Sequence, residues 1–187
     1  DQFYIRTDAD GAINYQVMVA PLSMSSRQDW KPWMPHRSEV QVASLECFAR
    51  HIVLVERQGG LPHLRVLDVE SGDDHRVALP EDCYDLGLES NPTFDVDEVR
   101  FRYTSMVTPS TVFAYDMTQR TQRVLKVLPV PGFDASRYQT TRIMAPAADG
   151  TSIPISLVWL RGVQRDGSAP MLLYGYGSYG ITVDASF

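Results

Sequence analysis

The densest glycine cluster of the chain is the hexapeptide GYGSYG, which spans Gly175–Gly180. Three glycines within six residues permit backbone conformations that other residues disfavour, and they allow the neighbouring side chains to project from a loop. A predicted strand, Met171–Tyr174, leads directly into this loop and has the apolar composition of a buried strand. Loops held at strand ends often carry functional side chains, so we expect the chemistry of this chain to lie here.

Gly175, Gly177 and Gly180 match the pattern G-x-G-x-x-G, which binds dinucleotides when it follows a strand. The same pattern requires a helix after the last glycine and an acidic residue about 20 positions further on. Too few residues follow Gly180 for either feature to be checked. The hairpin that we predict before the loop also differs from the usual start of a dinucleotide-binding domain. A nicotinamide oxidoreductase is therefore the least favoured class.

Ser178 is the only nucleophile type within the hexapeptide, and a nucleophile elbow would place it in G-x-S-x-G. That spelling requires glycine at the position that Tyr176 occupies. The chain also has no histidine after His75, so a base for this serine would have to come from the first part of the chain. Ser178 therefore does not meet the requirements for a catalytic nucleophile.

Tyr176 suggests a third interpretation, in which its phenol donates a hydrogen bond to the oxygen that becomes negative as a tetrahedral intermediate forms. The simpler alternative is that Tyr174, Tyr176 and Tyr179 only cover the end of the predicted strand. The local residues by themselves favour this structural alternative, and both interpretations stay open at this point.

A repeat with an offset of 48 residues organises the first part of the chain. Phe3–Val19 aligns with His51–Leu67, and that stretch aligns in turn with Val99–Tyr115. Each copy contains a strand, a short polar loop, a second strand, a polar turn and a further strand. Mostly stranded repeats of about 40 to 50 residues are typical of β-propellers. A β-sandwich whose similar strands imitate a repeat is the alternative fold.

The hydrophobic pattern of these copies has the period of strands. Val99, Phe101 and Tyr103 alternate with polar residues, which predicts a strand with one buried face. Ile52–Val55 is continuously apolar, as expected for a strand that is buried on both faces. The stretch WKPWMPHR, residues 30–37, reads as an insertion that could reach a ligand, although packing over the face of a sheet is the favoured interpretation.

A second region begins after the repeat ends at Lys126. The stretch VLPVPGFDASRY is rich in proline and glycine, which predicts a linker. A β-hairpin follows, with strands at 138–145 and 153–160 and a turn around Asp149. We therefore expect a partial propeller of about three blades in residues 1–132 and a second domain that begins within residues 133–187.

Composition and charge exclude several classes of function. With 187 residues, of which 44% are hydrophobic and 21% charged, the chain has the composition of a folded protein. The net charge is −6 and the basic residues are scattered, so we expect no nucleic-acid partner. No apolar run approaches the roughly 18 residues of a membrane span, so we expect no membrane partner. Cys47 and Cys83 lie far apart, and we expect neither metal nor cofactor.

Five segments that occur in order along the chain resemble a known family. They are SNPTF, FRYTSMVTPSTVFAYD, VPGFDASRY, APAADGTSIPISLVWL and MLLYGYGSYG. Together these segments resemble the oligopeptidase B group of the prolyl oligopeptidase family of serine peptidases. The resemblance covers most of the chain and is strongest from Asn91 onward. Several ordered segments are more specific than any single glycine pattern.

The resemblance implies a mostly β fragment that holds the C-terminal blades of a seven-bladed β-propeller and the first strands of an α/β-hydrolase domain. Residues 133–187 would then be the linker and the N-terminal part of the peptidase domain. The implied activity is hydrolysis of short peptides after Arg or Lys. The family places an oxyanion-hole donor at Tyr176 and an aromatic residue of the substrate pocket at Tyr179. It also implies a cytoplasmic location.

The family's catalytic serine, aspartate and histidine all match positions beyond the end of this chain. We therefore expect the chain alone to be inactive and assign none of its own Ser, Asp or His residues to these roles. An incomplete propeller exposes strand edges and apolar faces, so we also expect self-association. The rival hypothesis is a non-catalytic propeller that binds a peptide or protein partner.

Overall fold

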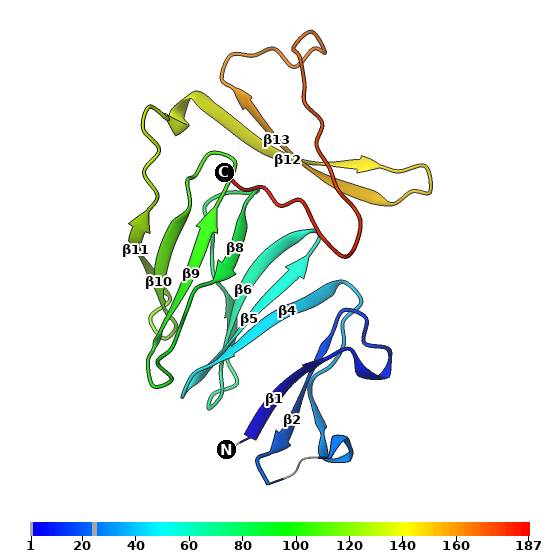
Figure 1. Cartoon of the computed structure of the whole chain (residues 1–187), viewed down its shortest axis with the longest axis vertical. Helices are drawn as coiled ribbons and strands as arrows, with labels where there is room; N and C mark the ends of the chain where they lie inside the picture. The colour runs from blue at the N-terminus through cyan, green and yellow to red at the C-terminus, as the bar shows by residue number, and fades with distance from the viewer. Residues whose placement is uncertain (1, 24–25) are drawn as a thin grey trace. The chain divides into compact units, whose positions relative to one another are not determined.

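The structure is a computed structural model, and it describes residues 2–23 and 26–187. Strands make up 47% of it, and the helical elements of the described residues are three short 3-10 turns. The strands form four antiparallel sheets, and most of the strands are labelled in Figure 1. The scarcity of helix expected from the hydrophobic pattern is confirmed.

The chain folds into two compact units. The first holds the chain up to Val77 together with Pro92–Asp97, and the second holds Ala78–Asn91 and Glu98–Phe187. The short segment Pro92–Asp97 is held in the first unit by a hydrogen bond of 2.9 Å from the backbone N–H of Ala49 to the carbonyl of Phe94.

The first unit begins with a three-stranded sheet in the order β1-β2-β3. Its strands are β1 Gln2–Thr7, β2 Gln16–Pro21 and β3 Lys31–Met34. The expectation that residues 30–37 form an insertion over a sheet face is wrong for β3, because Lys31 pairs with Val19 and Met34 pairs with Val17. This part of the tryptophan-rich stretch is a strand of the sheet itself.

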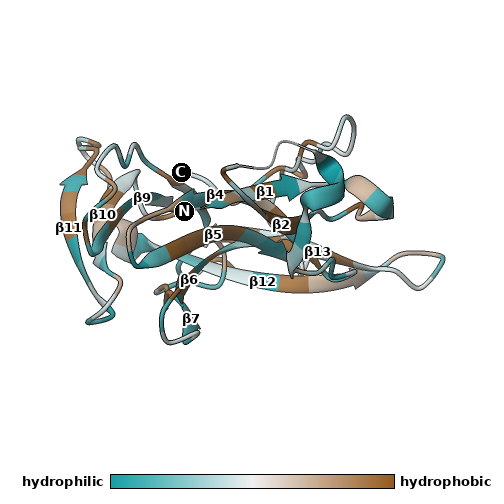
Figure 2. Ribbon diagram, turned by 90° about the horizontal axis from the view of Figure 1, so that it is seen from below, coloured by the Kyte–Doolittle hydropathy of each residue, from teal (hydrophilic) through white to brown (hydrophobic). Residues whose placement is uncertain are grey.

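The second sheet of this unit has four strands in sequence order. They are β4 Val40–Cys47, β5 His51–Gln58, β6 Leu61–Asp68 and β7 Asp74–Arg76. A two-residue turn at Gly59–Gly60 joins β5 to β6, with positive φ at both positions, as the favoured hairpin turn requires. Ile52–Val55 is buried as expected from its continuous apolar run, and much of β5 is coloured as hydrophobic in Figure 2.

The core of the first unit contains residues of both sheets. Its buried members are Val17, Met34, Val42, Ile52 and Leu54. Partly buried hydrophobic side chains, among them Tyr4, Trp33 and Leu67, pack around this cluster. Burial of this apolar surface is the main term that stabilises the unit, at roughly 1.5 to 3 kcal/mol for each large side chain.

The second unit contains a four-stranded sheet in the order β11-β10-β9-β8. Its strands are β8 Asp85–Leu88, β9 Glu98–Thr104, β10 Thr111–Asp116 and β11 Thr121–Val127. The alternation predicted for β9 is confirmed, because Val99, Phe101 and Tyr103 are buried while the arginines between them are exposed. Every residue of β11 is exposed.

The predicted hairpin of the second unit is confirmed as β12 Tyr138–Pro146 and β13 Ser152–Leu160. Asp149 Oδ1 accepts a hydrogen bond of 2.9 Å from the N–H of Thr151, and Gly150 has a φ of 86°. These features form the turn between the two strands. Such a turn favours glycine because other residues rarely adopt positive φ.

The prediction of a buried strand at Met171–Tyr174 is wrong. These four residues have no strand structure, and their side chains are between 75% and 89% exposed. A strand forms through hydrogen bonds to a neighbouring strand, and the sheets of the described residues leave this segment unpaired. The apolar composition of this segment therefore does not by itself predict a strand.

The repeat of 48 residues corresponds to three equivalent antiparallel hairpins. The copies fall on β1 with β2, on β5 with β6, and on β9 with β10. In each case the third strand of the copy pairs with the second strand, as the repeat predicts.

Candidate functional site

The glycine-rich segment Gly175–Gly180 forms an open loop with a turn at its end. The N–H of Ile181 donates a hydrogen bond of 3.0 Å to the carbonyl of Ser178, which closes this turn. Tyr179 and Gly180 both have positive φ, at 53° and 66°. Tyr179 therefore adopts a conformation that is uncommon for a residue with a side chain.

The phenol predicted to act as a donor is accessible. The side chain of Tyr176 is 48% exposed, and that of Tyr179 is 90% exposed. Tyr174 precedes them without strand structure, so the three tyrosines do not cover a strand end in this structure. The roles assigned to Tyr176 and Tyr179 stay predictions.

Residues 181–187 form no helix in this structure. The described residues contain no group of three or more His, Cys, Asp and Glu side chains placed to hold a metal ion. In the same part of the chain, no helix is long and apolar enough to cross a membrane.

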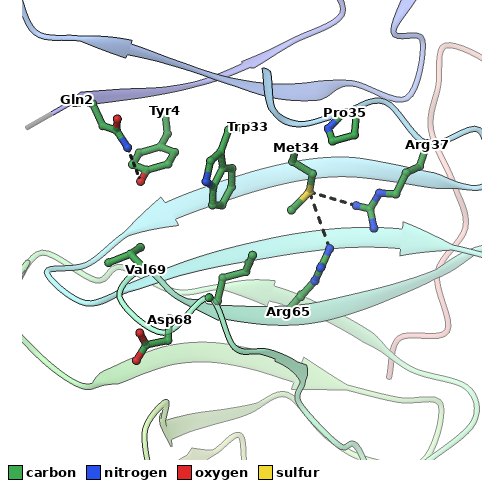
Figure 3. Close-up of a pocket in the computed structure, with 11 residues that line it drawn as sticks. Gln2, Tyr4, Trp33, Met34, Pro35, Arg37, Arg65, Asp68 and Val69 are labelled. Carbon is green, nitrogen blue, oxygen red and sulfur yellow. Dashed lines mark hydrogen bonds between the residues drawn. The ribbon is translucent and has the colours of Figure 1, made fainter. Parts of the chain in front are cut away.

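The first unit contains a groove with a volume of about 570 Å³, shown in Figure 3. We call it the arginine groove. Tyr4 of β1 and Trp33 of β3 form its aromatic part, with ring centroids 5.0 Å apart in an edge-to-face arrangement. Leu67 and Val69 add aliphatic surface. The groove therefore presents aromatic and aliphatic surface beside its polar side chains.

Two guanidinium groups lie at one end of the arginine groove. Arg37 Nη2 lies 3.4 Å and Arg65 Nη1 3.9 Å from the sulfur of Met34, and Figure 3 shows both side chains converging on it. Asp68 lies at the other end of the view. The groove is thus chemically asymmetric, with cationic side chains concentrated at a single end.

The cationic end is built around a buried carboxylate. Glu56 on β5 has a fully buried side chain, and Oε1 accepts hydrogen bonds from Arg37 and, at 3.2 Å, from Arg65. Oε2 lies 3.4 Å from Arg76 Nη2, and Arg65 also pairs with Asp74. We call these five residues the Glu56 cluster. Its ion pairs join three guanidinium groups to two carboxylates.

Opposing effects act on the pKa of Glu56. Burial acts to raise this pKa because it disfavours the charged form. The hydrogen bonds and positive charges of Arg37 and Arg65 outweigh burial and hold the pKa of Glu56 below its ordinary value. The carboxylate is therefore charged at neutral pH, and it holds both arginines at the end of the groove.

Asp68 accepts hydrogen bonds from the turn that follows it. Its Oδ1 accepts hydrogen bonds of 2.9 Å from the N–H groups of Ser71 and Glu70. The hydrogen bond from Ser71 is the largest cause of the lowered pKa of Asp68. Oδ2 lies 3.6 Å from Arg50 and 3.8 Å from Nε2 of the buried His51. Both oxygens thus have partners within the protein.

The sequence interpretation did not identify the arginine groove, although it allowed that residues 30–37 could reach a ligand. Arg37 lies at the end of the supposed insertion, and Arg65 lies on a strand that was read only as part of a repeat. A further signal was Glu56, a charged residue that directly follows the buried run Ile52–Val55. A carboxylate in such a position requires cationic partners, but only the packing of the sheets identifies them.

The fold of this chain is typical of the β-propellers, because short antiparallel sheets recur at a fixed offset along the chain. The model of the N-terminal β-propeller domain of prolyl oligopeptidase matches residues 1–128. The chain therefore belongs to the prolyl oligopeptidase family, whose members are serine peptidases, as the resemblance implied.

The curated relatives that match the whole chain include the following two. Dipeptidyl aminopeptidase BI of Pseudoxanthomonas mexicana is 46% identical over 188 residues, which cover 100% of this chain and 26% of the relative. Protease 2 of Moraxella lacunata is 30% identical, with 100% of this chain and 26% of the relative covered. The chain thus spans about a quarter of the length of these relatives.

Solved structures of oligopeptidase B resemble the chain along its full length. The enzyme from Trypanosoma brucei, with covalently bound antipain, superimposes with a TM-score of 0.89 at 29% identity, covering 100% of this chain and 28% of the enzyme. The enzyme from Leishmania major gives a TM-score of 0.88 at 27% identity, covering 100% of this chain and 27% of the enzyme.

Proposed function

We propose that the chain is the last part of the β-propeller and the beginning of the α/β-hydrolase domain of a serine oligopeptidase that hydrolyses short peptides after Arg or Lys. The observation that carries the proposal is the match to solved oligopeptidase B structures over the entire chain, at 27% and 29% identity. A partial propeller alone would account for only the first 128 residues.

The proposed domain boundary lies at residues 132 and 133. The family model of the propeller ends at residue 128, and the hairpin of β12 and β13 begins at Tyr138. The residues between them contain Pro129, Pro131 and a glycine at position 132 with a φ of 79°, as expected for a linker. The sheets before this linker are assigned as blades and the hairpin after it as the first strands of the hydrolase domain.

We assign Tyr176 as the oxyanion-hole donor of the intact peptidase and Tyr179 to its substrate pocket. The loop of Gly175–Gly180 leaves the phenol of Tyr176 half-exposed and free to point at a bound peptide. One donor aimed at a developing oxyanion lowers the barrier to acyl transfer by about 3 kcal/mol. The nucleophile, base and acid come from outside this chain, so the chain alone is inactive.

The test compares the intact protein with the isolated chain. Both are assayed on a short chromogenic peptide with Arg before the scissile bond, and a peptide with Glu at that position is the matched control. We expect hydrolysis of the Arg peptide by the intact protein only. Appreciable hydrolysis by the isolated chain would contradict the missing triad, and equal rates on the two peptides would contradict the basic specificity.

A second candidate activity is the release of dipeptides from free N-termini. It is favoured by the 46% identity to a protein named dipeptidyl aminopeptidase, which exceeds the identity to either solved oligopeptidase B. Chromogenic dipeptides with a free and with an acetylated N-terminus separate the two activities. Loss of hydrolysis on acetylation would identify the dipeptidyl activity, whereas an endopeptidase would accept both substrates.

A further inference from the structure

We propose that the arginine groove binds a small apolar carboxylate, with its anionic group at Arg37 and Arg65 and its apolar body against Tyr4 and Trp33. This site is formed entirely by the first unit. Its lining includes neither Tyr176 nor Tyr179.

The charge of the Glu56 cluster favours an anion. Its ion pairs hold three guanidinium groups with two carboxylates, which leaves one positive charge in excess. The side chains of Arg37 and Arg65 remain 31% and 20% exposed, so a ligand in the groove can approach them. One positive charge fits a monoanion better than a di- or trianionic phosphate.

The hydrogen bonds at this end of the groove also favour a carboxylate. Arg37 and Arg65 each direct one N–H group to the sulfur of Met34, which is a weak acceptor. A carboxylate oxygen is a much stronger acceptor of guanidinium hydrogen bonds than a thioether. A bound carboxylate would therefore replace poor contacts with good ones.

The rest of the groove suits an apolar body of modest size. Its volume of about 570 Å³ lies within the range of small-molecule sites. The rings of Tyr4 and Trp33, with Leu67 and Val69, offer aromatic and aliphatic contact. Asp68 has its own partners at the other end, and so does not require a cation from the ligand.

The first experiment is calorimetric titration of the intact protein with 3-phenylpropionate, after a covalent serine-directed inhibitor has blocked the catalytic centre. The matched control ligand is 3-phenylpropanamide, which has the same shape without the charge. We expect the acid to bind with a dissociation constant of about 1 mM and the amide about tenfold or more weakly. Absence of binding by the acid, or equal binding of both ligands, would overturn the proposal.

The second experiment locates the site with a matched pair of variants at Pro35. This exposed residue lies beside Met34 at the cationic end of the groove. Pro35→Glu adds a carboxylate that competes for the arginines, whereas Pro35→Gln makes the same backbone change without charge. We expect the Glu variant to bind 3-phenylpropionate at least about fivefold more weakly than the Gln variant.

Equal affinities of the two Pro35 variants would place the ligand elsewhere and overturn the proposal. Because both variants lose the same proline, a shared loss of stability cancels in the comparison. This pair also distinguishes the groove from the function proposed above, because its result does not depend on whether the serine-directed reagent reacts.

Discussion

Arg65 Nη1 lies 3.2 Å from Glu56 Oε1, although the Glu56 side chain is completely buried. A carboxylate in such surroundings is stable only when its charge is balanced and its oxygens accept hydrogen bonds. Arg37, from the segment after β3, and Arg76, from β7, complete this balance. One glutamate thus connects the central strands of the four-stranded sheet to the chain that leads into it.

Glu56→Gln is expected to destabilise the first unit by about 3 kcal/mol, because it leaves three guanidinium groups without their shared counter-charge. The measurement is the opening free energy of β5 and β6 amides, obtained by native-state hydrogen exchange on the intact protein.

Glu98→Gln is the control, since Glu98 pairs with Arg123 at 2.8 Å on the surface of the second unit. Both side chains there are well exposed, and we expect a loss under about 1 kcal/mol in the amides of β9. Similar losses of opening free energy in the two variants would contradict this prediction, because the buried Glu56 would then stabilise the fold no more than the exposed Glu98 does.

The lowered pKa of Glu56 predicts a pH dependence of stability. A carboxyl group whose folded pKa lies below its unfolded value contributes stability that is fully present above the unfolded pKa of about 4.3. That contribution is lost as the pH falls through the lower, folded pKa. Acidification from pH 6 toward about pH 3 should therefore destabilise the wild type more than Glu56→Gln. Parallel profiles would assign the acid sensitivity to other carboxylates.

Tyr176→Phe in the intact protein should lower kcat by about 10²-fold, because it removes one hydrogen-bond donor to the transition state and leaves the ring in place. Tyr174→Phe removes a phenol that is 75% exposed in the same segment, and it should leave kcat unchanged. Steady-state kinetics on the preferred chromogenic peptide provide the comparison. An unchanged kcat in Tyr176→Phe would contradict the role of Tyr176 as an oxyanion-hole donor.

The isolated chain is expected to self-associate. β11 is exposed along its whole length, and Leu172 and Leu173 are 89% and 75% exposed. Exposed strand edges and apolar segments favour pairing with another copy. Sedimentation velocity at micromolar concentration should show species larger than a monomer, and Leu172→Glu combined with Leu173→Lys should reduce them. A wild-type chain that sediments only as a monomer would contradict this expectation.

Local patterns were sufficient to predict most strands of the propeller region. The alternation of Val99, Phe101 and Tyr103 with arginines marks one buried face, and the glycine pair before β6 marks a hairpin turn. These signals are reliable because the partner strand is the next one along the chain. Met171–Tyr174 shows where such reasoning fails, because the sheets formed by residues 2–23 and 26–187 offer its apolar residues no strand with which to pair.

The sequence by itself determined the repeat, the hairpin of β12 and β13, and the segments that resemble serine oligopeptidases, because each is a pattern of residue types along the chain. Only the tertiary structure decided that WKPWMPHR contributes a strand and that Arg37, Arg65 and Arg76 surround one carboxylate. Those contacts depend on how separate strands pair and pack, and no spacing within a single segment encodes that arrangement.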